Sequence, residues 1–530
     1  MEQKAEMADL TPFARKVLGH MVKDPEKREE FIGTRDLQPV SQSTCAQAFA
    51  DRIQKAVDKE EKILIAGDYD CDGILGTSIL VDGLKKAGLQ VGFYIPDRIK
   101  EGYGLSPKTV RMAAEKGYSL IITVDNGVEA HEALAEAKKL GVEVVVTDHH
   151  QIQTSPDCSL LVHPSLMEDS FSTLCGAGVA YELLRALKRD EDKHLQWAAA
   201  ASVADCMVVT GETRAIIQQG LILLNEKRER HLSLLCNTSR YTEEEIGFQI
   251  APRINSVGRL ANMANANNVV RYFLNNDPVQ LQAFAAQLDT LNNTRKELSA
   301  LTVSRAAAKI RAQWPVLLAA DPSFHEGVVG LAAGNLFQRT GKPVIIGAIN
   351  DFGVKCSMRA PEGFDCMAFL DGFEPGYEAR GGHAGAAGMT IALENWDAFQ
   401  KFVFQQGMKT RWKPVKPAPM VVNPDDLTVS DLHSLDLLRP FGKGFELPPF
   451  EIAHPRVASV YDLSGGKHRK FTLADGLECL HFNQSENDMA RSVLSIRRFI
   501  GKPSLNVYNG RESVNFLIDE IDYASSKDPV

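Results

Sequence analysis

Short apolar runs and helical periodicities alternate along residues 60–165 of the chain. The runs KILIA, SLIITV and VEVVV are mostly aliphatic and rich in β-branched residues, which is typical of buried strands. The segments between them, such as SPKTVRMAAEKG and HEALAEAKKLG, place apolar residues at helical spacing. Strands that alternate with helices in this way predict βαβ units and a parallel, doubly wound sheet.

The pattern changes several times after this region. Residues 175–235 are predicted to be mostly helical. Residues 277–312 keep apolar positions at helical spacing with neither glycine nor an interior proline, which predicts one long connecting helix. A second α/β pattern follows from PVLLAAD to GGHAGAAGMTI. The proline-rich segment 411–424 predicts a linker, and the short strands beyond it predict a small β-barrel or sandwich.

Composition and charge fit a globular protein of several domains. The 530 residues are 24% charged and 44% hydrophobic, with a net charge of −9. Nine cysteines stand singly without a CxxC pair, which argues against a disulfide framework and a structural zinc site. No apolar run approaches the roughly 18 residues of a membrane helix, and the first ten residues lack the apolar core of a signal peptide. We therefore expect a cytoplasmic protein without a membrane partner.

The stretch DYDCDG, Asp68 to Gly73, places three aspartates at alternate positions. This spacing matches the first half of a calcium-binding EF-hand loop. Position 12 of such a loop would be a bidentate glutamate, whereas here it is Ile79, and a predicted strand stands where an EF-hand has a helix. These differences exclude the calcium loop. They leave three carboxylates at the carboxyl end of a strand, where open α/β sheets bind their ligands.

Other strands of the same predicted sheet also end in potential metal ligands. Asp125 follows IITV, and Asp148, His149 and His150 follow VEVVVT, while Asp205 ends a predicted helix. Any one of them is an ordinary loop residue, but parallel strands bring their carboxyl ends to one edge of the sheet. Carboxylates packed together become protonated unless cations balance them. Mixed carboxylate and imidazole ligands without thiolate predict Mn²⁺ or Mg²⁺.

The order of these motifs resembles a known superfamily. DYDCDG, VDNG, TDHH and SVAD are similar to the four successive motifs of the DHH phosphoesterases. APRINSVGRL, HEGVVGLAAGNL, VKCSMRA, GGHAGAAGM and LLRPFGKGFELPPF resemble, within that superfamily, the RecJ family of single-strand-specific 5′ to 3′ DNA exonucleases. The resemblance extends over about residues 50–520.

The resemblance implies an α/β fold with a terminal barrel. Its expected parts are an N-terminal helical extension (1–50), a parallel-sheet DHH phosphoesterase domain (51–265), a connecting helix (266–313), a DHH-associated α/β domain (314–410) and an OB-fold single-strand-binding β-barrel (411–530).

The same resemblance implies two divalent ions, Mn²⁺ or Mg²⁺. By position, Asp70 would bind the first ion and Asp72 the second. Asp125 would bridge both ions, and His149 and Asp205 would complete the second site. Two ions about 3.5–4 Å apart can polarise a phosphodiester for attack in line at phosphorus.

Three further residues are implied as catalytic or supporting groups. His150 and His383 would contact the scissile phosphate, and Asp68 would support the first ion or serve as an occasional ligand. Many DHH enzymes have a histidine four residues before the aspartate that corresponds to Asp70, and here that position is Ala66. We therefore expect a first metal site that is completed by water or by Asp68.

The resemblance also implies a path for DNA. It assigns a 5′-phosphate pocket to Arg98, Ser357 and Arg359, and the strand's path to Arg253, Asn255 and Arg259. Each arginine taken alone is explained equally well by a surface salt bridge. Basic residues of the expected barrel that would hold a single strand are Lys467, His468, Arg469, Lys470, Arg497, Arg498 and Lys502. Phe445 replaces an asparagine that is frequent at its position in the family.

We expect a single-stranded-DNA-specific 5′ to 3′ exonuclease of DNA recombination and repair that releases 5′-mononucleotides. Single-stranded DNA is the expected partner, with a helicase or a single-strand-binding protein as further candidates, and the chain is expected to be a monomer. A DHH oligoribonuclease or a phosphatase acting on cyclic dinucleotides or pyrophosphate would share the metal ligands but normally lack the long helix and the barrel. A catalytically inactive, replication-associated scaffold would have lost ligands that this chain retains.

Overall fold

The computed structural model of the chain describes residues 6–413, 415, 417–482 and 491–524. They form two compact units, each built from separate stretches of sequence. Unit 1 contains Met1–Gln38, Cys206–Gln219 and Pro417–Val530, and unit 2 contains Pro39–Asp205 and Gly220–Lys416. Among the described residues, no helix has both the length and the apolar composition that crossing a bilayer requires.

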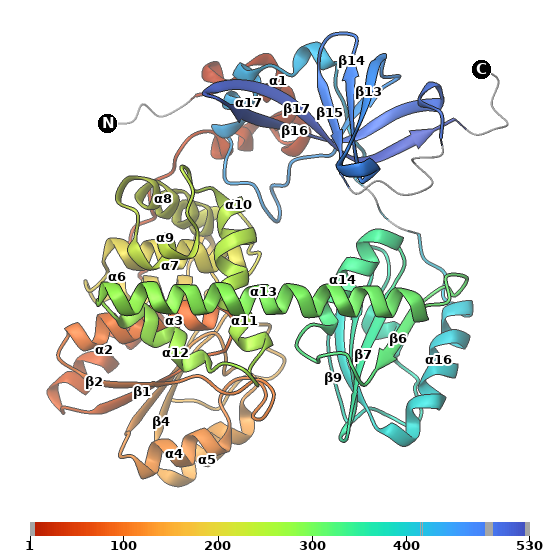
Figure 1. Cartoon of the computed structure of the whole chain (residues 1–530). Coiled ribbons are helices and arrows are strands. Elements are labelled where there is room, and N and C mark those ends of the chain that lie inside the picture. Colours follow the sequence, from red (N-terminus) through yellow and green to blue (C-terminus); the bar gives the residue numbers. More distant parts are fainter. Residues whose placement is uncertain (1–5, 414, 416, 483–490, 525–530) are drawn as a thin grey trace. The chain divides into compact units, whose positions relative to one another are not determined.

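Unit 2 begins with a five-stranded parallel sheet, which confirms the first α/β prediction (Figure 1). Its strand order is β2-β1-β3-β4-β5. The strands are β1 (Lys62–Ala66), β2 (Gln90–Tyr94), β3 (Leu120–Thr123), β4 (Glu143–Thr147) and β5 (Leu160–Val162). Ala66 pairs with both Tyr94 and Thr123, so β1 and its two neighbours reach the same edge of the sheet.

Helices cover both faces of this sheet. Val110, Leu134 and Val144 share one buried cluster, which places α4 and α5 against one face, and α3 lies on the other (Figure 1). The helices of this part are α2 (Thr44–Asp58), α3 (Cys71–Lys86), α4 (Pro107–Glu115), α5 (His131–Leu140), α6 (Gly176–Ala186) and α7 (Asp192–Ala204).

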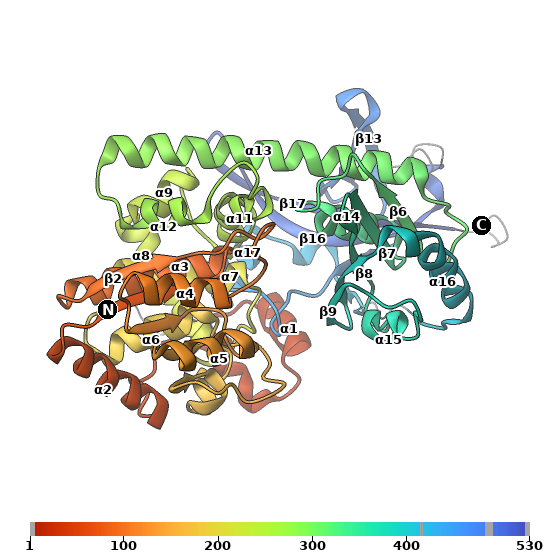
Figure 2. The same cartoon turned by 90° about the horizontal axis from the view of Figure 1, so that it is seen from below.

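A helical segment leads to the second α/β domain. It contains α8 (Gly211–Lys227), α9 (Arg230–Leu235), α10 (Glu243–Glu245), the π-helical turn η5 (Ile246–Ile250), α11 (Ala251–Arg259), α12 (Ala266–Leu274) and α13 (Pro278–Lys309). The side chain of Asp277 accepts hydrogen bonds from the first turn of α13, and a proline occupies the first helical position, so the start of this helix is well defined. The helix runs without interruption for 32 residues, as the sequence pattern predicts (Figure 2).

The second domain of unit 2 has a mixed five-stranded sheet of order β6-β7-β8-β10-β9. Only the β6–β7 pair is parallel. The strands are β6 (Leu317–Asp321), β7 (Val344–Asn350), β8 (Gly353–Arg359), β9 (Ala379–His383) and β10 (Ala386–Ile391), and the helices are α14 (Val329–Thr340), α15 (Cys366–Leu370) and α16 (Trp396–Lys409).

Unit 1 is built on a seven-stranded sheet of order β11-β12-β16-β17-β15-β14-β13. Its elements are α1 (Pro12–Met21), β11 (Met420–Val421), α17 (Val429–Asp436), β12 (Phe450–Ala453), β13 (Val457–Leu463), β14 (His468–Leu473), β15 (Glu478–His481), β16 (Ile496–Tyr508) and β17 (Arg511–Tyr523). The short strand β11 lies inside the segment predicted to be a linker.

The N-terminal helix belongs to the core of unit 1. Figure 1 shows α1 beside the C-terminal strands, and the rings of Phe13 and Phe450 lie 5.9 Å apart. Phe445 stacks on Phe31 at 4.2 Å, with the Arg214 guanidinium 4.9 Å from its ring. Phe445 therefore fills a core shared by the two ends of the chain. The domain boundaries expected from the sequence stay a prediction.

Candidate metal centre

The turn after β1 carries the three aspartates of DYDCDG. Asp70 caps α3, because its Oδ1 accepts hydrogen bonds from the backbone N of Asp72 at 3.0 Å and of Gly73 at 3.1 Å. A Cβ on Gly73 would lie 2.6 Å from the backbone N and O of Asp68. The glycine therefore allows the turn to close on itself, which explains its place in the motif without a calcium ion.

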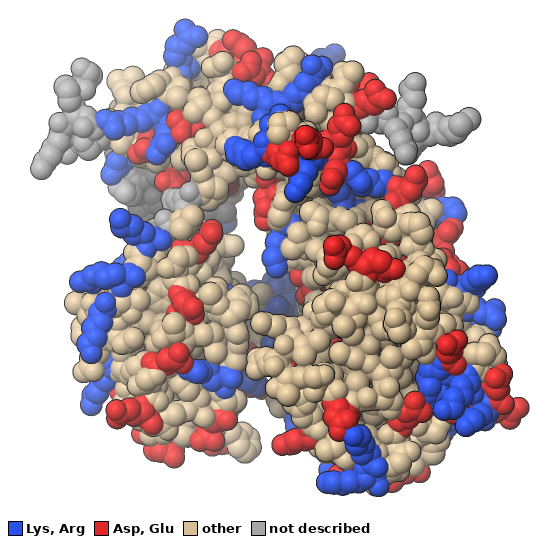
Figure 3. All heavy atoms as spheres, turned by 180° about the vertical axis from the view of Figure 1, so that it is seen from behind, with Lys and Arg blue, Asp and Glu red and all other residues tan. Residues whose placement is uncertain are grey.

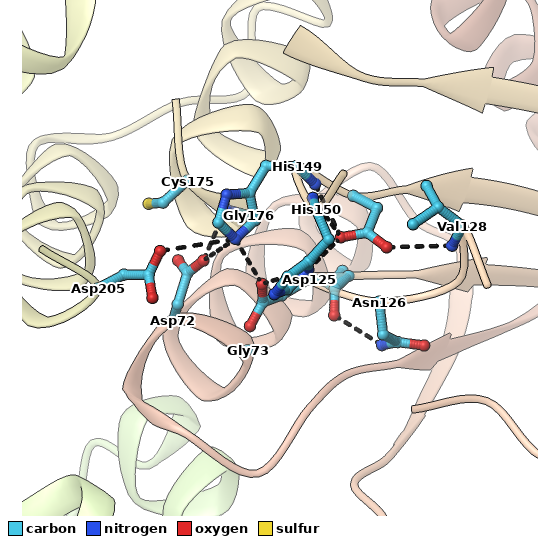
Figure 4. A network of polar contacts seen from close by, with 12 residues as sticks. Asp72, Gly73, Asp125, Asn126, Val128, His149, His150, Cys175, Gly176 and Asp205 are labelled. Atoms are coloured by element: carbon cyan, nitrogen blue, oxygen red, sulfur yellow. Dashed lines mark hydrogen bonds and ion pairs between the residues drawn. The ribbon is translucent and has the colours of Figure 1, made fainter. Parts of the chain in front are cut away.

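Asp72 and Asp125 are buried at the carboxyl end of the parallel sheet. The Asp72 carboxylate accepts hydrogen bonds from the backbone N of Gly176 at 2.7 Å and of Ala177 at 2.8 Å, at the amino end of α6. Asp125 follows β3 with a left-handed φ of 61°. Nε2 of His149, just after β4, lies 3.0 Å from Oδ1 of Asp125 (Figure 4).

The ligand atoms gather mainly in two adjoining groups, and the atoms of each group lie within 4.8 Å of one another. The first group is Asp68, Asp70 and Asp125, and the second is Asp72, His149 and Asp205. A third set, Asp125, His149 and His150, shares one residue with each of them. Nε2 of His149 also lies 3.7 Å from Asp72 Oδ2 and 3.6 Å from Asp205 Oδ2. The structure thus brings together every residue to which the resemblance assigns a metal. Which ion each residue binds stays a prediction.

The electrostatics of these groups favour bound cations. Burial raises the pKa of Asp125 well above its usual value, and the charges of Asp72, Asp70 and Asp68 add to the effect. Burial and the neighbouring aspartate also raise the pKa values of Asp68 and Asp70. Oδ1 of Asp68 is buried with no hydrogen-bond partner among the described residues. Hard divalent cations would satisfy such an oxygen-rich set of ligands.

His150 is held beside the metal groups by a carboxylate and a phenol. Its Nδ1 donates to Asp148 Oδ1 at 2.7 Å and lies 3.2 Å from the Tyr103 hydroxyl. That hydroxyl donates to the backbone O of Asp125 at 2.7 Å. Although burial alone would lower the pKa of His150, the hydrogen bond and charge of Asp148 raise it to about 9. Tyr103 could not be predicted from the sequence, because it lies in an irregular segment.

Three of the predicted arginines, Arg98, Arg259 and Arg359, lie near enough to one another for their charges to interact, and we call this cluster the basic pocket. The Arg98 guanidinium lies over the Tyr69 ring at 5.1 Å, and Nη1 of Arg359 donates to Ser357 Oγ at 2.9 Å. Burial, together with the charges of Arg98, Arg295 and Arg359, lowers the pKa of Arg259 to about 10.

Arg295, on α13, is a member of this basic pocket that was not predicted from the sequence. Its guanidinium donates to Asn292 Oδ1 at 2.8 Å. The sequence pattern around Arg295 is only a weak indication of a functional role, because arginines are common on exposed helices. The positive charges of these four arginines repel one another without an anion, so the pocket is suited to a phosphate.

The other two residues expected along the strand's path contact the protein itself. Arg253 forms an ion pair with Asp289 on α13 at 2.7 Å, and Asn255 Oδ1 accepts a hydrogen bond from the backbone N of Cys71 at 2.8 Å. Asn255 therefore fixes the backbone between Asp70 and Asp72. The structure does not bring Arg253 into the basic pocket.

His383 lies at the exposed end of β9. Its Nδ1 accepts a hydrogen bond from the backbone N of Gly385 at 3.2 Å. Among the described residues, His383 is in neither group of ligand atoms. Its contact with a phosphate stays a prediction.

The basic side chains of the C-terminal sheet are partly neutralised by neighbouring strands. On the face of unit 1 seen in Figure 3, acidic and basic side chains are interspersed. Ion pairs join Arg469 to Asp462, Lys470 to Glu478, and Arg498 to both Glu451 and Asp522. The sheet is therefore not a uniformly basic surface.

Family models match three parts of the chain. The DHH family N-terminal domain matches residues 62–210, the DHHA1 domain matches residues 302–407, and the RecJ OB domain matches residues 420–520. These matches confirm the fold class expected from the sequence.

Curated relatives match the chain along most of its length. The single-stranded-DNA-specific exonuclease RecJ of Bacillus subtilis is 32% identical, with 97% of this chain and 68% of the relative covered. The RecJ protein of Dickeya dadantii is 31% identical, with 88% of this chain and 89% of the relative covered.

Solved structures agree with these relatives. The crystal structure of RecJ in complex with Mn²⁺ from Thermus thermophilus has a TM-score of 0.84 and 26% identity, and the match covers 98% of this chain and 77% of that chain. An exonuclease RecJ bound to manganese has a TM-score of 0.63 and 30% identity over 71% of this chain and 97% of its own. The ligand groups, the fold and these likenesses together show that the chain belongs to the RecJ family of the DHH superfamily.

Proposed function

We propose that this protein is a metal-dependent exonuclease that degrades single-stranded DNA from its 5′ end and releases 5′-mononucleotides. The observation that carries the proposal is the pairing of two adjoining ligand groups with a basic pocket nearby. Arg98 and Arg259 lie close enough to Asp68 and Asp70 for their charges to interact. A strand end bound in the pocket would therefore lie beside the metal ligands.

The ligand set suits two divalent ions of the Mn²⁺ or Mg²⁺ class. Asp70, with Asp68 in place of the histidine missing at Ala66, would hold one ion, and Asp125 would contact both. Asp72, His149 and Asp205 would hold the other. When bound, such ions polarise a phosphodiester and lower the pKa of water.

The chain's own residues would position the phosphate. Asp148 keeps His150 oriented and favours its charged form, so that the imidazolium can pair with a phosphate oxygen. Asn255 fixes the backbone between two ligand aspartates. His383, in its glycine-rich hairpin, would approach the same phosphate from the second domain.

The 5′ to 3′ direction of degradation would follow from the basic pocket. A terminal phosphate monoester carries up to two negative charges, whereas an internal phosphodiester carries one, so clustered arginines favour the end of the strand. Binding the 5′ end at a fixed distance from the metals would set the bond that is cut. In the barrel, Lys467 and Lys502 are candidate contacts for single-stranded DNA.

The cellular setting is part of the same proposal. The protein would act in the cytoplasm as a monomer in DNA recombination and repair, on strands supplied by a helicase or covered by a single-strand-binding protein. The intact ligand set disfavours the inactive scaffold.

The decisive experiment uses single strands labelled at the 5′ or the 3′ end. With Mn²⁺ the protein should release labelled mononucleotide at once from the 5′-labelled strand. EDTA or Asp125→Ala should abolish the release, with a loss of about 10³-fold or more expected for an interaction central to the transition state. Degradation from the 3′ end, or full activity of the variant, would contradict the mechanism.

A second variant tests polarity separately. Arg359→Ala removes a guanidinium from the basic pocket without touching a metal ligand. The preference for a 5′-phosphorylated over a 5′-hydroxyl strand should fall by about tenfold. An unchanged preference in competition assays would show that the pocket is misassigned.

A further inference from the structure

The basic pocket is assembled from two domains of unit 2. Arg98 follows β2 of the first α/β domain and Arg259 ends α11 of the adjoining helical segment, whereas Ser357 and Arg359 belong to β8 of the second α/β domain. The segment His325–Gly330, which leads into α14, runs between these two sets, and we call it the docking turn.

One contact of the docking turn is a hydrogen bond between the domains. His325 Nδ1 accepts from the backbone N of Gly327 at 3.1 Å, so its Nε2 carries the proton and donates to Asn262 Oδ1 at 3.0 Å. Asn262 lies just beyond Arg259 in the chain. The imidazole therefore ties the turn to the segment that carries Arg259.

The second contact is a direct approach of two backbones. A Cβ on Gly327 would lie only 1.7 Å from the carbonyl O of Arg259 and 2.7 Å from its carbonyl C. Backbone atoms cannot move aside as a flexible side chain can. Any residue other than glycine at this position must separate the docking turn from Arg259.

The other end of the docking turn faces the pocket residues of β8. A Cβ on Gly330 would lie 3.2 Å from Ser357 Oγ and 3.3 Å from Arg359 Nη2. Within the part of the chain that the structure describes, no side chain caps the amino end of α14. The first N–H groups of a helix and its dipole favour an anion, so this end of α14 adds donors to the guanidinium groups.

We propose that the docking turn assembles the end-binding pocket, and that Gly327 is a specificity-determining position for a terminal phosphate monoester. This inference rests on the proposed function and explains how the preference for a phosphorylated strand end arises. Repulsion between the arginines opposes docking while the pocket is empty. A bound phosphate dianion relieves that repulsion, so end binding and domain docking stabilise each other.

The test compares two glycine variants near α14. Gly327→Ala places a methyl group against the Arg259 carbonyl, whereas Gly334→Ala, farther along the same helix, meets no atom within 4 Å. Dissociation constants for 5′-phosphorylated and 5′-hydroxyl oligonucleotides are measured by fluorescence anisotropy in EDTA, so that no cleavage contributes. The preference for the phosphorylated end should fall about tenfold in Gly327→Ala and stay at the wild-type value in Gly334→Ala.

A second measurement tests the coupling between end binding and domain docking. The phosphorylated oligonucleotide should raise the melting temperature of wild type and Gly334→Ala more than the hydroxyl form does, and this difference should vanish in Gly327→Ala. If Gly327→Ala does not fold, His325→Ala decides in its place, since it removes only the two side-chain hydrogen bonds of the imidazole, to Asn262 and to the backbone N of Gly327. A loss of about threefold is expected.

The outcomes separate this inference from the proposed function. A wild-type preference that Gly327→Ala, or His325→Ala in its place, retains in full would overturn the role of the docking turn and leave the exonuclease proposal intact. A wild type without any preference for a 5′-phosphorylated end would remove the pocket itself, and the inference with it.

Discussion

At the scale of single residues, Asp125 has opposite effects on stability and on metal binding. Its side chain is buried near four other aspartates, and burial and their charges raise its pKa. The folded pKa lies above the unfolded one, so the carboxyl destabilises the metal-free protein at neutral pH and does so less as the pH falls. Bound cations would reverse this effect.

We therefore expect Asp125→Asn to stabilise the metal-free protein and to remove its response to metal. Asparagine keeps the shape of the side chain and tolerates the left-handed φ of 61°, which alanine tolerates less well. In EDTA the melting temperature should rise by about 2–4 °C for each kcal/mol of repulsion relieved, and more at pH 8 than at pH 5. Mn²⁺ should raise the melting temperature of wild type only. A metal-free variant less stable than wild type would contradict the account.

At the scale of elements, the amino end of α6 positions the candidate metal ligand Asp72. Gly176 and Ala177 donate their backbone N–H groups to Asp72, and a Cβ on Gly176 would lie 2.6 Å from Asp125 Cβ and 3.0 Å from Asp72 Oδ2. The helix can reach the carboxylate only because residue 176 has no side chain.

Gly176→Ala should weaken Mn²⁺ binding by about 10–100-fold, as expected when a partner that orients a ligand is displaced. Gly178→Ala, one half-turn further along α6, is the matched control, because its Cβ would meet mainly the flexible side chain of Leu174 at 3.1 Å. Titration calorimetry measures the Mn²⁺ affinity of both variants. Equal affinities in the two variants would show that α6 does not hold the site.

The elements also show what a sequence can and cannot reveal. The clustering of candidate ligands at the ends of β1, β3 and β4 was predictable, because apolar runs locate strands and parallel strands share an edge. The span of α13 was predictable from its helical spacing and from its lack of glycine and interior proline. The positions of Tyr103, Arg295 and Gly327 were not, since their roles depend on contacts with segments far away in the chain.

At the scale of the whole molecule, the two ends of the chain form one core. Phe13, Val17 and Leu18 of α1 are buried with Phe450 and Phe499 of the C-terminal sheet. The pattern of an amphipathic helix indicates that it packs against another element, but it does not identify that element. The N-terminal segment is therefore a structural part of unit 1, although the catalytic domain follows it directly in sequence.

This arrangement predicts how the chain tolerates truncation. A fragment of residues 1–416 keeps α1 but loses the strands that cover Phe13, Val17 and Leu18, whose burial is worth about 1.5–3 kcal/mol each. It should expose this apolar surface and self-associate, whereas a fragment of residues 39–416 should stay monomeric and retain its Mn²⁺-dependent rise in melting temperature. Light scattering after gel filtration, with binding of an apolar dye, distinguishes the two. Replacing the three α1 residues by serine in the longer fragment should restore the monomer, and self-association that persists would place the exposed surface elsewhere.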